Sequence, residues 1–367
     1  MVGDPVRGTP NTGAASVSAA TPDSAPALSV VIATYNRADS ARRLLRQLGQ
    51  QTIAPSQFEV IVVDDGSNPP VATQLASLDL PYALQVVRQE NAGPGAARHN
   101  ALARARGAVA VLVDDDMSIE PSFLAEHAAA HRAGVRRVAL GPLRGRDTLA
   151  LPLFERCHLA LLEKLEREVK AGRGTLRGTN LYTGNVSFPR ADYFAVGGFD
   201  RDFRLSEDTE LGVRLELAGL DFIFAEAAIA WHDSDHTSLR TWMRRSRAYG
   251  ASDARVAEKH PDLASVSPWR FLLLMNPLAR PFLVASVLAP TLVVPAARAA
   301  MLLSTALAKV GAERLAIAGT TVVYGMLYFA GVRTHAGSLR RAAGQLTRYL
   351  TRRGRPPTSI ERVSIAT

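Results

Sequence analysis

Cysteine is almost missing from this chain of 367 residues, which contains only Cys157. A single cysteine excludes any intrachain disulfide, which fits a reducing compartment. Cys157 lies in the stretch FERCHLALLEKLEREVK, whose apolar residues recur at helical spacing. We therefore expect this cysteine to pack in the core rather than act as a nucleophile.

The first 26 residues lack an apolar run and consist mainly of Ala, Ser, Thr, Pro and Gly. Such a composition cannot bury a core, so residues 1–26 are predicted to be a disordered tail. They also lack the apolar segment of a signal peptide. The domain that follows is therefore expected to stay in the cytoplasm.

Acidic residues are scarce at the other end of the chain. From Pro268 onward there are 13 Lys and Arg against two acids, Glu313 and Glu361, whereas the preceding residues have 30 against 32. The net charge of +9 therefore comes from the C-terminal region. A basic and apolar region favours a membrane surface as partner over nucleic acid, whose binding regions combine basic charge with polar and aromatic residues.

Apolar runs alternate with helical patterns in the N-terminal third. Strands are predicted at 28–34, 58–65, 84–89 and 108–115, and helices between them at 38–51 and 95–107. The runs are continuously apolar, as in strands that are covered on both faces. The alternation predicts an α/β fold with a Rossmann-like, mostly parallel sheet and helices on both faces, which we extend over residues 27–260.

A polar cluster follows each predicted strand. In parallel sheets, ligands bind at the carboxyl ends of the strands, so these clusters predict a binding site. The clusters are Thr34-Tyr35-Asn36-Arg37, Asp64-Asp65-Gly66-Ser67, Asn91-Ala92-Gly93 and Asp114-Asp115-Asp116.

Asp65 lies at the mouth of the predicted sheet, directly before Gly66. Its carboxylate could accept hydrogen bonds from the ribose or the base of a nucleotide. An Asp-Gly pair also forms turns without any ligand. Both interpretations stay open at this point.

Asp114 and Asp116 follow the buried run AVAVLV, and they lie on one side if the alternation of a strand continues to them. Two carboxylates on one side can hold Mg²⁺ or Mn²⁺ bound to a diphosphate. Arg98, one strand end away, could meet the same phosphates. The alternative is a solvated acidic loop.

Asp208 begins a predicted helix together with Glu207, beside a Gly-rich loop. It has the attributes of a general base, although acidic residues are also favoured structurally in a first helical turn. His232 and His236 could complete a metal site or bind phosphate, and a structural role is the alternative.

Two other classes fit less well. GPGAAR places Arg98 where a dinucleotide-binding loop needs a third small residue. An acidic-motif phosphatase would carry its Asp-x-Asp on an early strand and needs a downstream lysine. Only four lysines are present: Lys164, Lys170, Lys259 and Lys309.

The last hundred residues contain long charge-free segments, at 281–297 and 315–332. They are close to the shortest length that spans a bilayer. We expect a membrane-associated helical region over 268–335 and a basic tail over 336–367, at the cytoplasmic face of the cell membrane. Two short spans or a re-entrant hairpin is the preferred arrangement, and interfacial helices or a buried core helix are the alternatives.

Six motifs in this order resemble family 2 glycosyltransferases of the GT-A fold, over residues 28 to 250. They are VVIATYNR, VIVVDDGS, NAGPGAARHNALARARG, VAVLVDDDM, TGNVSFPRADYFAVGGFD and SEDTELGVRL. The resemblance implies that Thr34, Tyr35 and Arg37 line a nucleotide pocket and that Asp65 contacts the base. It also implies that Asp114 and Asp116 end an Asp-x-Asp metal motif around Asp115, with Asp116 the more direct ligand, and that Asp208 is the catalytic base.

The chain departs from the family pattern at Ala33, where proline is frequent, and in LRTWMRRSRAYG, which lacks the Gln-x-x-Arg-Trp motif of processive synthases. The resemblance therefore implies a metal-dependent, inverting transfer of one sugar from a nucleotide-sugar donor. The acceptor would be lipid-linked or a cell-envelope saccharide. The alternative is a catalytically silent, membrane-anchored scaffold that binds sugar nucleotides.

Overall fold

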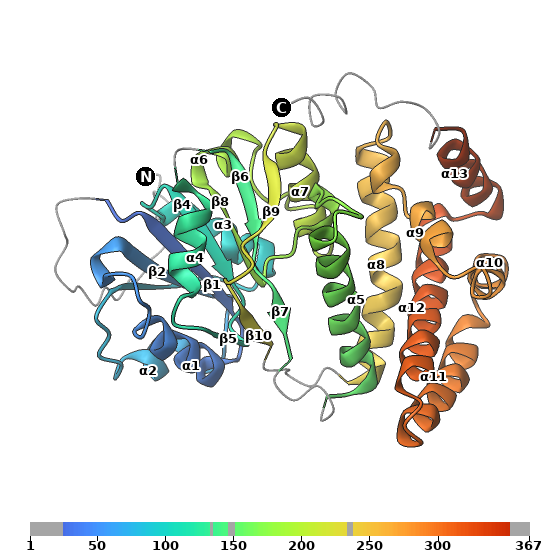
Figure 1. Ribbon diagram of the computed structural model, residues 1–367, viewed down its shortest axis with the longest axis horizontal. Coiled ribbons are helices and arrows are strands. Elements are labelled where there is room, and N and C mark those ends of the chain that lie inside the picture. The colour runs from blue at the N-terminus through green and yellow to red at the C-terminus, as the bar shows by residue number, and fades with distance from the viewer. Residues whose placement is uncertain (1–24, 133–134, 146–150, 233–237, 353–367) are drawn as a thin grey trace, which may run out of the picture.

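The computed structural model describes residues 25–132, 135–145, 151–232 and 238–352. Its main sheet has seven strands in the order β3-β2-β1-β4-β8-β6-β9 (Figure 1). All neighbouring pairs are parallel except those made by β8, which is antiparallel to β4 and to β6. The predicted mostly parallel α/β sheet is confirmed. The strands are β1 (Leu28–Thr34), β2 (Phe58–Asp64), β3 (Ala83–Arg88), β4 (Val109–Val113), β6 (Arg137–Leu140), β8 (Asn185–Pro189) and β9 (Asp221–Phe224).

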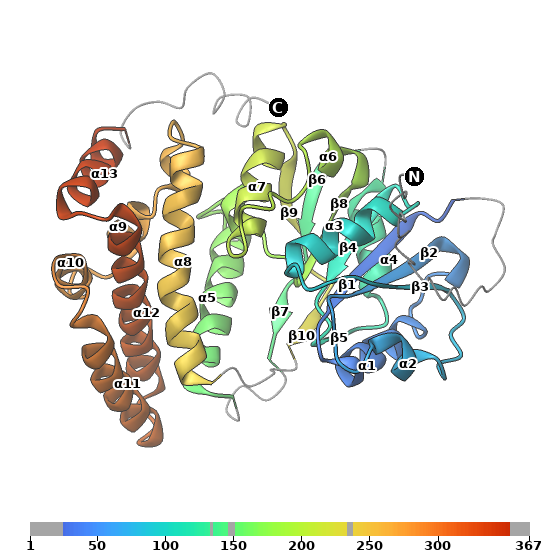
Figure 2. The same cartoon turned by 180° about the vertical axis from the view of Figure 1, so that it is seen from behind.

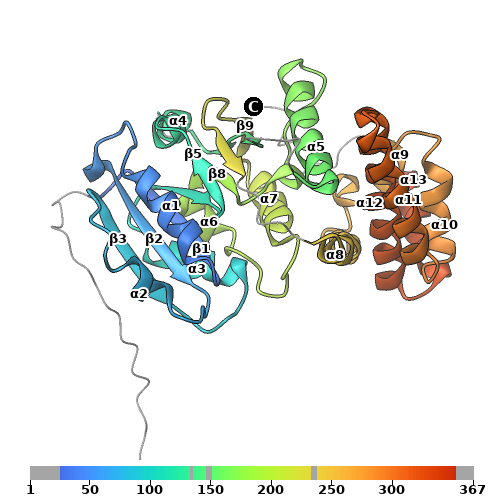
Figure 3. The ribbon, with the colours of Figure 1, turned by 90° about the horizontal axis from the view of Figure 1, so that it is seen from below.

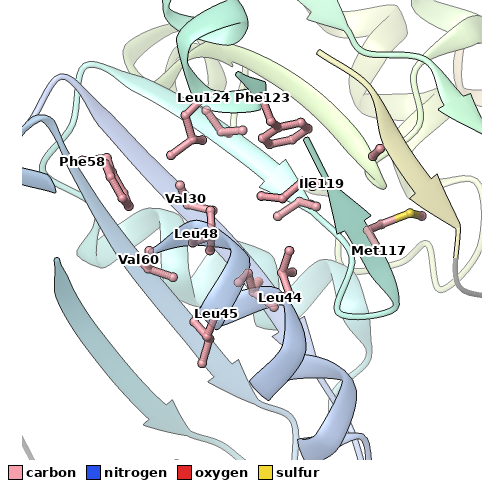
Figure 4. Close-up of a cluster of buried hydrophobic side chains, with 14 of the residues drawn as sticks. Val30, Leu44, Leu45, Leu48, Phe58, Val60, Met117, Ile119, Phe123 and Leu124 are labelled. Atoms are coloured by element: carbon pink, nitrogen blue, oxygen red, sulfur yellow. The ribbon is translucent and has the colours of Figure 1, made fainter. Parts of the chain in front are cut away.

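Helices cover both faces of this sheet, as predicted. Alternate residues of the central strands face opposite sides, so Val30 and Val60 join one core and Val31 and Ile61 join the other. Figure 4 shows the first core, where leucines of α1 lie over β1 and β2. The helices of the α/β part are α1 (Ala38–Leu48), α2 (Val71–Leu75), α3 (Pro94–Arg104), α4 (Phe123–Ala130), α6 (Arg190–Ala195) and α7 (Glu207–Leu217).

A second, three-stranded sheet lies beside the end of β4, in the order β5-β10-β7. Its strands are β5 (Met117–Ile119), β7 (Leu143–Arg144) and β10 (Ala230–His232). The antiparallel register of β10 on β5 places His232 opposite Met117, the residue after the acidic cluster. This small sheet therefore brings a distant histidine to Asp116.

The C-terminal half adds a layer of helices on one side of the α/β part (Figures 2 and 3). The long helices α8 and α12 lie side by side. Cys157 of α5 is buried against α12, as its helical pattern predicts. The helices are α5 (Leu153–Lys170), α8 (Leu239–Lys259), α9 (Trp269–Leu274), α10 (Arg280–Leu288), α11 (Val293–Lys309), α12 (Glu313–Ala336) and α13 (Leu339–Arg352).

Two glycines allow α8 and α12 to approach closely. A Cβ atom at Gly250 of α8 would lie 1.9 Å from the carbonyl oxygen of Tyr328. A Cβ at Gly331 of α12 would lie 1.9 Å from the carbonyl oxygen of Arg247. Real side-chain atoms do not come so near, so only glycine fits at either position. The backbones of α8 and α12 are thus in direct contact.

The apolar segment 281–297 does not form a single spanning helix. It divides into α10 and the start of α11 around Pro290, since proline cannot continue a helix interior. The nine residues of α10 reach only about 14 Å, less than half of a bilayer core. Among the residues that the structure describes, α12 alone is long and apolar enough to cross a membrane, and 61% of its apolar window is buried in the protein.

Candidate active site

The carboxyl ends of β1, β2 and β4 lie next to one another, because these strands are adjacent and parallel. Thr34 ends β1 opposite Asp64 of β2, and the acidic cluster begins directly after Val113 of β4. The predicted polar clusters that follow these three strands are therefore brought to one edge of the sheet. The N-terminus of α7, with Glu207, reaches the same edge.

The first two strand ends are joined by hydrogen bonds. The backbone N–H of Asn36, a residue with φ of 56°, donates to Oγ of Ser67 at 2.8 Å. The N–H of Asn68 donates to Oδ1 of Asn36 at 2.8 Å. Thr34 is buried here, whereas the ring of Tyr35 is 49% exposed. Tyr35 is therefore open to a ligand, as is the neighbouring Asn36, whereas Thr34 is not.

Asp65 is buried and accepts three hydrogen bonds from the loop after β3. Its Oδ1 accepts from Nε2 of Gln89 at 2.8 Å and from the N–H of Ala92 at 2.9 Å. Its Oδ2 accepts from the N–H of Gly93 at 2.9 Å. Gly66 next to it has a φ of 88°, so the turn interpretation of this Asp-Gly pair holds. The carboxylate ties the end of β2 to the loop after β3, and its contact with a base stays a prediction.

The three acidic residues form ion pairs with two different arginines. Nη1 of Arg37 lies 3.2 Å from Oδ1 of Asp115 and 3.0 Å from Oδ2 of Asp116. Asp114 instead pairs with Nη2 of Arg98 at 2.6 Å. The alternation that would place Asp114 and Asp116 on one side was wrongly extended, because β4 ends at Val113. Arginine pairing, rather than strand geometry, orients these carboxylates.

The pKa of Asp115 is raised in this cluster. Burial raises the pKa of the Asp115 carboxyl to about 6, while the Thr34 hydroxyl and the Arg37 guanidinium lower it, and Asp116 raises it again. Charged groups of one sign held together in a partly dry site shift in this way. The cluster therefore favours a positively charged partner.

Arg98 connects the acidic cluster to the helix that carries Asp208. It is buried, and its Nη1 lies 3.5 Å from Oε1 of Glu207. Burial, followed by the neighbouring Glu207 carboxylate, raises the pKa of Asp208 to about 7, although the N–H of Thr209 donates to Oδ1 of Asp208 at 2.7 Å. A carboxylate that titrates near neutral pH is suited to general-base catalysis.

Asp116 and His232 form the best candidate for holding a divalent cation. Oδ2 of Asp116 lies 3.8 Å from Nε2 of His232. Within the described ranges no three His, Cys, Asp or Glu side chains are grouped as a complete metal site. Mg²⁺ and Mn²⁺ in nucleotide sites commonly take only one or two protein ligands, the rest coming from phosphate and water. The donor set fits such an ion. His236 lies outside the described residues.

Asp253 of α8 was not found by sequence reasoning, although it borders this site. Its Oδ1 accepts from Oγ of Ser206 at 2.7 Å, and its Oδ2 accepts from the Tyr328 hydroxyl at 2.7 Å. Ser206 directly precedes Glu207 and has a φ of 57°. An acidic residue inside an amphipathic helix gives no local signal of such contacts, because its partners are distant in the sequence.

Comparison with known proteins identifies the family. The model of glycosyl transferase family 2 matches residues 29–154, and that of glycosyl transferase family group 2 matches residues 110–330. The two matches together include every site residue described above. The second alone covers more than half of the chain.

Curated relatives agree with this result. The chain is 29% identical over 273 residues to validoxylamine A glucosyltransferase of Streptomyces hygroscopicus subsp. limoneus, a match that covers 66% of this chain and 59% of that protein. It is 30% identical over 146 residues to succinoglycan biosynthesis protein ExoO of Rhizobium meliloti, covering 39% of this chain and 41% of that protein. The chain thus spans about six tenths of the first of these relatives.

A solved structure shows the same fold. The mannosyltransferase PcManGT from Pyrobaculum calidifontis, in complex with GDP-Man and Mn²⁺, matches with a TM-score of 0.59 and 20% identity. The match covers 86% of this chain and 89% of that one, so the GT-A fold expected from the sequence is confirmed. Taken with the family models, these similarities show that the chain belongs to the family 2 glycosyltransferases.

Proposed function

We propose that this protein is a metal-dependent, inverting glycosyltransferase that moves one sugar from a nucleotide-sugar donor to an acceptor hydroxyl. The observation that carries the proposal is the position of the buried Arg98, which pairs with Asp114 of the acidic cluster at 2.6 Å and lies 3.5 Å from Glu207, the neighbour of Asp208. Membership of the family and relatives named for glucosyl transfer and for succinoglycan biosynthesis support it. The proposed site also includes the remaining predicted residues, which are Thr34, Tyr35, Arg37, Asp65, Asp114, Asp115, Asp116 and His232.

Asp208 acts as the general base of the reaction. It takes the proton of the acceptor hydroxyl while the acceptor oxygen bonds to the anomeric carbon of the sugar. The bond from this carbon to the diphosphate oxygen breaks on the opposite face, so the configuration inverts. The raised pKa of Asp208 suits this role, since a stronger base accepts the proton more readily.

Arg98 stabilises the leaving group. Its guanidinium is held between Asp114, at Nη2, and Glu207, at Nη1. From this position its positive charge would offset the charge of the departing nucleoside diphosphate. A bound Mg²⁺ or Mn²⁺ supplies further neutralisation of that charge, and Asp116 and His232 would hold it. Tyr35 and Arg37 lie on the donor side of these groups, at the end of β1.

We place the enzyme at the cytoplasmic face of the cell membrane, with a lipid-linked or cell-envelope saccharide as acceptor. Of the sixteen large apolar residues exposed in the described part, ten lie between Leu274 and Leu315. Arg280, Arg298, Lys309 and Arg314 lie in the same region, against the single acid Glu313. Exposed apolar and cationic residues together favour an anionic bilayer surface. Because α10 is short and α12 is largely buried, we propose that α9 to α12 lie on the membrane rather than cross it.

The competing candidate is a catalytically silent scaffold that binds sugar nucleotides. A scaffold would have no use for Asp208, whose pKa is suited to proton transfer. The two functions differ in turnover and not in donor binding.

A panel of nucleotide sugars tests the proposal. The protein is incubated with each donor and Mn²⁺, with lipid-linked and soluble acceptors, and release of nucleoside diphosphate is measured. We expect release from at least one donor, abolished by a chelator and restored by excess Mn²⁺. Calorimetric binding of a donor without release in any combination would instead establish the scaffold.

A further inference from the structure

A hollow that the proposed reaction does not use lies between the C-terminal half of α8, α9 and α13. It consists of two adjoining cavities of about 270 and 620 Å³, which share Glu258, Gln345 and Arg348 in their walls. Figures 1 and 2 show α13 beside α9 at the outer edge of the helical layer. Sites for small molecules are commonly roughly 300–1,000 Å³ in volume.

The two cavities differ in chemistry. The smaller one is walled mainly by apolar and aromatic side chains, among them Ala257, Leu263 and Trp269. The larger one is bordered by Arg340, Arg341 and Arg348. An apolar slot that opens into a cationic mouth matches a molecule with an apolar chain and an anionic head.

Two buried polar groups in the wall of the smaller cavity have no hydrogen-bond partner among the described residues. Trp269 is 3% exposed, and its indole N–H makes no hydrogen bond within the described residues. Oε1 of Gln345 is likewise buried without a partner there. Buried donors and acceptors are nearly always satisfied, and each exception calls for an explanation. An indole N–H can donate to an ester oxygen, and an amide oxygen can accept from a hydroxyl, so the two groups suit a glycerol-based head.

The charge at the mouth is uncompensated. Arg340, Arg341 and Arg348 make no ion pair with any residue that the structure describes. Glu258, the acid in both walls, is engaged by Nε2 of His335 at 2.9 Å. Three unpaired guanidiniums around one opening form a strong site for phosphate oxygens.

The surroundings place this mouth where lipid would be available. Leu339 and Leu350 of α13 are each 45% exposed, and Leu274 of α9 is 69% exposed. Exposed leucines beside arginines are the composition of an interfacial membrane surface. A free phosphate ion would fill the cationic mouth but would leave the apolar slot without a role.

We propose that this hollow binds one anionic glycerophospholipid, with its phosphate at Arg340, Arg341 and Arg348 and its acyl chain along the slot beside Trp269. This inference extends the membrane contact proposed above and rests on it. It is independent of sugar transfer, since none of these residues belongs to the catalytic site.

The test uses dihexanoyl phosphatidylglycerol as a monomeric probe with the full-length protein. Binding is followed by calorimetry and by tryptophan fluorescence, with dihexanoyl phosphatidylcholine and inorganic phosphate as comparison ligands. We expect saturable binding of the anionic lipid, at least about tenfold tighter than either comparison ligand. Equal affinity for the two lipids, or phosphate bound as tightly as the anionic lipid, would overturn the proposal.

Variants locate the site. Replacing Arg340, Arg341 and Arg348 together by Gln should weaken binding at least about tenfold. The matched control is the triple Gln variant of the exposed Arg43, Arg104 and Arg201, which removes the same charge from the α/β part and should leave affinity unchanged. Equal losses in the two triple variants would show a non-specific charge effect and reject the site.

Separate measurements distinguish the lipid site from the proposed sugar transfer and from the proposed membrane contact. Trp269→Phe, which replaces the indole by a smaller aromatic ring without an N–H, should weaken binding and abolish most of the fluorescence change. Diphosphate release with a soluble acceptor reports on transfer, and flotation with anionic vesicles reports on membrane contact. Flotation and transfer that persist while the probe fails to bind would reject the lipid site alone.

Discussion

Oγ of Ser206 donates a hydrogen bond to Oδ1 of Asp253 at 2.7 Å, although 47 positions separate the two residues in the chain. The other oxygen of the same carboxylate accepts a hydrogen bond from Tyr328 of α12 at 2.7 Å. The proposed base, Asp208, lies two residues after Ser206 in the first turn of α7. The helical layer therefore fixes the start of the helix that carries this base.

Tyr328→Phe should lower the free energy of unfolding by about 1–2 kcal/mol, because one oxygen of a buried carboxylate loses its partner. It should also slow sugar transfer, since Ser206 is held less firmly. Urea unfolding and steady-state rates check both effects. Tyr324→Phe is the control, because Tyr324 lies one helical turn away and its hydroxyl makes no hydrogen bond to any residue that the structure describes. A similar loss of stability in the control would assign the effect to packing.

Asp208→Asn should reduce the transfer rate by about 10²- to 10⁴-fold, the usual contribution of a general base. Donor affinity should change little, because the amide keeps the volume of the carboxyl. Rates are measured at saturating donor, and affinity by calorimetry. Asp79→Asn, an exposed substitution of the same type, serves as the control. A rate within a few-fold of the wild type would remove Asp208 from the mechanism.

The transfer rate should rise with pH and level off above about 7. Burial and the Glu207 carboxylate raise the pKa of Asp208 to about 7, while Arg98 opposes the shift and Asp253 adds to it. Below this pH the carboxyl is protonated and cannot accept a proton. Glu207→Gln removes a repelling charge, so the midpoint should move to lower pH. A profile that stays level down to pH 5 in the wild type would contradict this assignment.

The raised pKa of Asp208 also makes the stability of the protein depend on pH. A carboxyl with a pKa that is higher in the folded than in the unfolded state binds its proton more tightly when folded. Its contribution to the free energy of unfolding is therefore present in full below the unfolded value and is lost as the pH rises through about 7. Asp208→Asn should flatten this part of the stability profile, measured by urea unfolding from pH 5 to 8.

Gly250→Ala and Gly331→Ala should each destabilise the protein by about 1–3 kcal/mol or more, because the added methyl group would collide with a backbone carbonyl oxygen of the facing helix. Thermal unfolding measures the change. Gly344→Ala in α13 is the control, since a Cβ atom there would lie 3.9 Å from its nearest described neighbour, a nitrogen of the flexible Arg348 side chain. That substitution should be neutral or stabilising, as alanine favours a helix. Stability unchanged in the first two variants would mean that the helices separate easily.

The central strands could be predicted from the sequence because each is a continuous apolar run. Residues 28–34 match β1 at both ends, and 58–65 exceeds β2 by one residue. The antiparallel strand β8 and the small sheet of β5, β7 and β10 were not predicted. These strands have two to five residues and depend on partners far away in the chain. Short strands carry too little local pattern to be distinguished from loops.

The sequence predicted which residues would form the site, and their roles stay predictions, but it did not predict how their side chains pair. The strand ends placed the acidic cluster near Arg98, as the geometry also does. Asp208 was instead predicted from its place at the start of a helix and from the family resemblance. The division of the carboxylates between Arg37 and Arg98 depends on side-chain packing after Val113, where no periodic pattern applies. The Asp253 contacts require the crossing of α7, α8 and α12, which no local sequence signal encodes.

The backbone contact between α8 and α12 limits where this protein can be shortened. A chain that ended at residue 260 would keep every proposed catalytic residue, yet it would expose the side of α8 that carries Gly250 and leave Asp253 without Tyr328. Such a fragment would expose to water the apolar residues that pack on the later helices, namely Leu153 and Phe154 of α5 and Trp242, Met243 and Tyr249 of α8. Expression of the catalytic part alone should therefore yield aggregates, and an active form should need the chain to extend through Ala336.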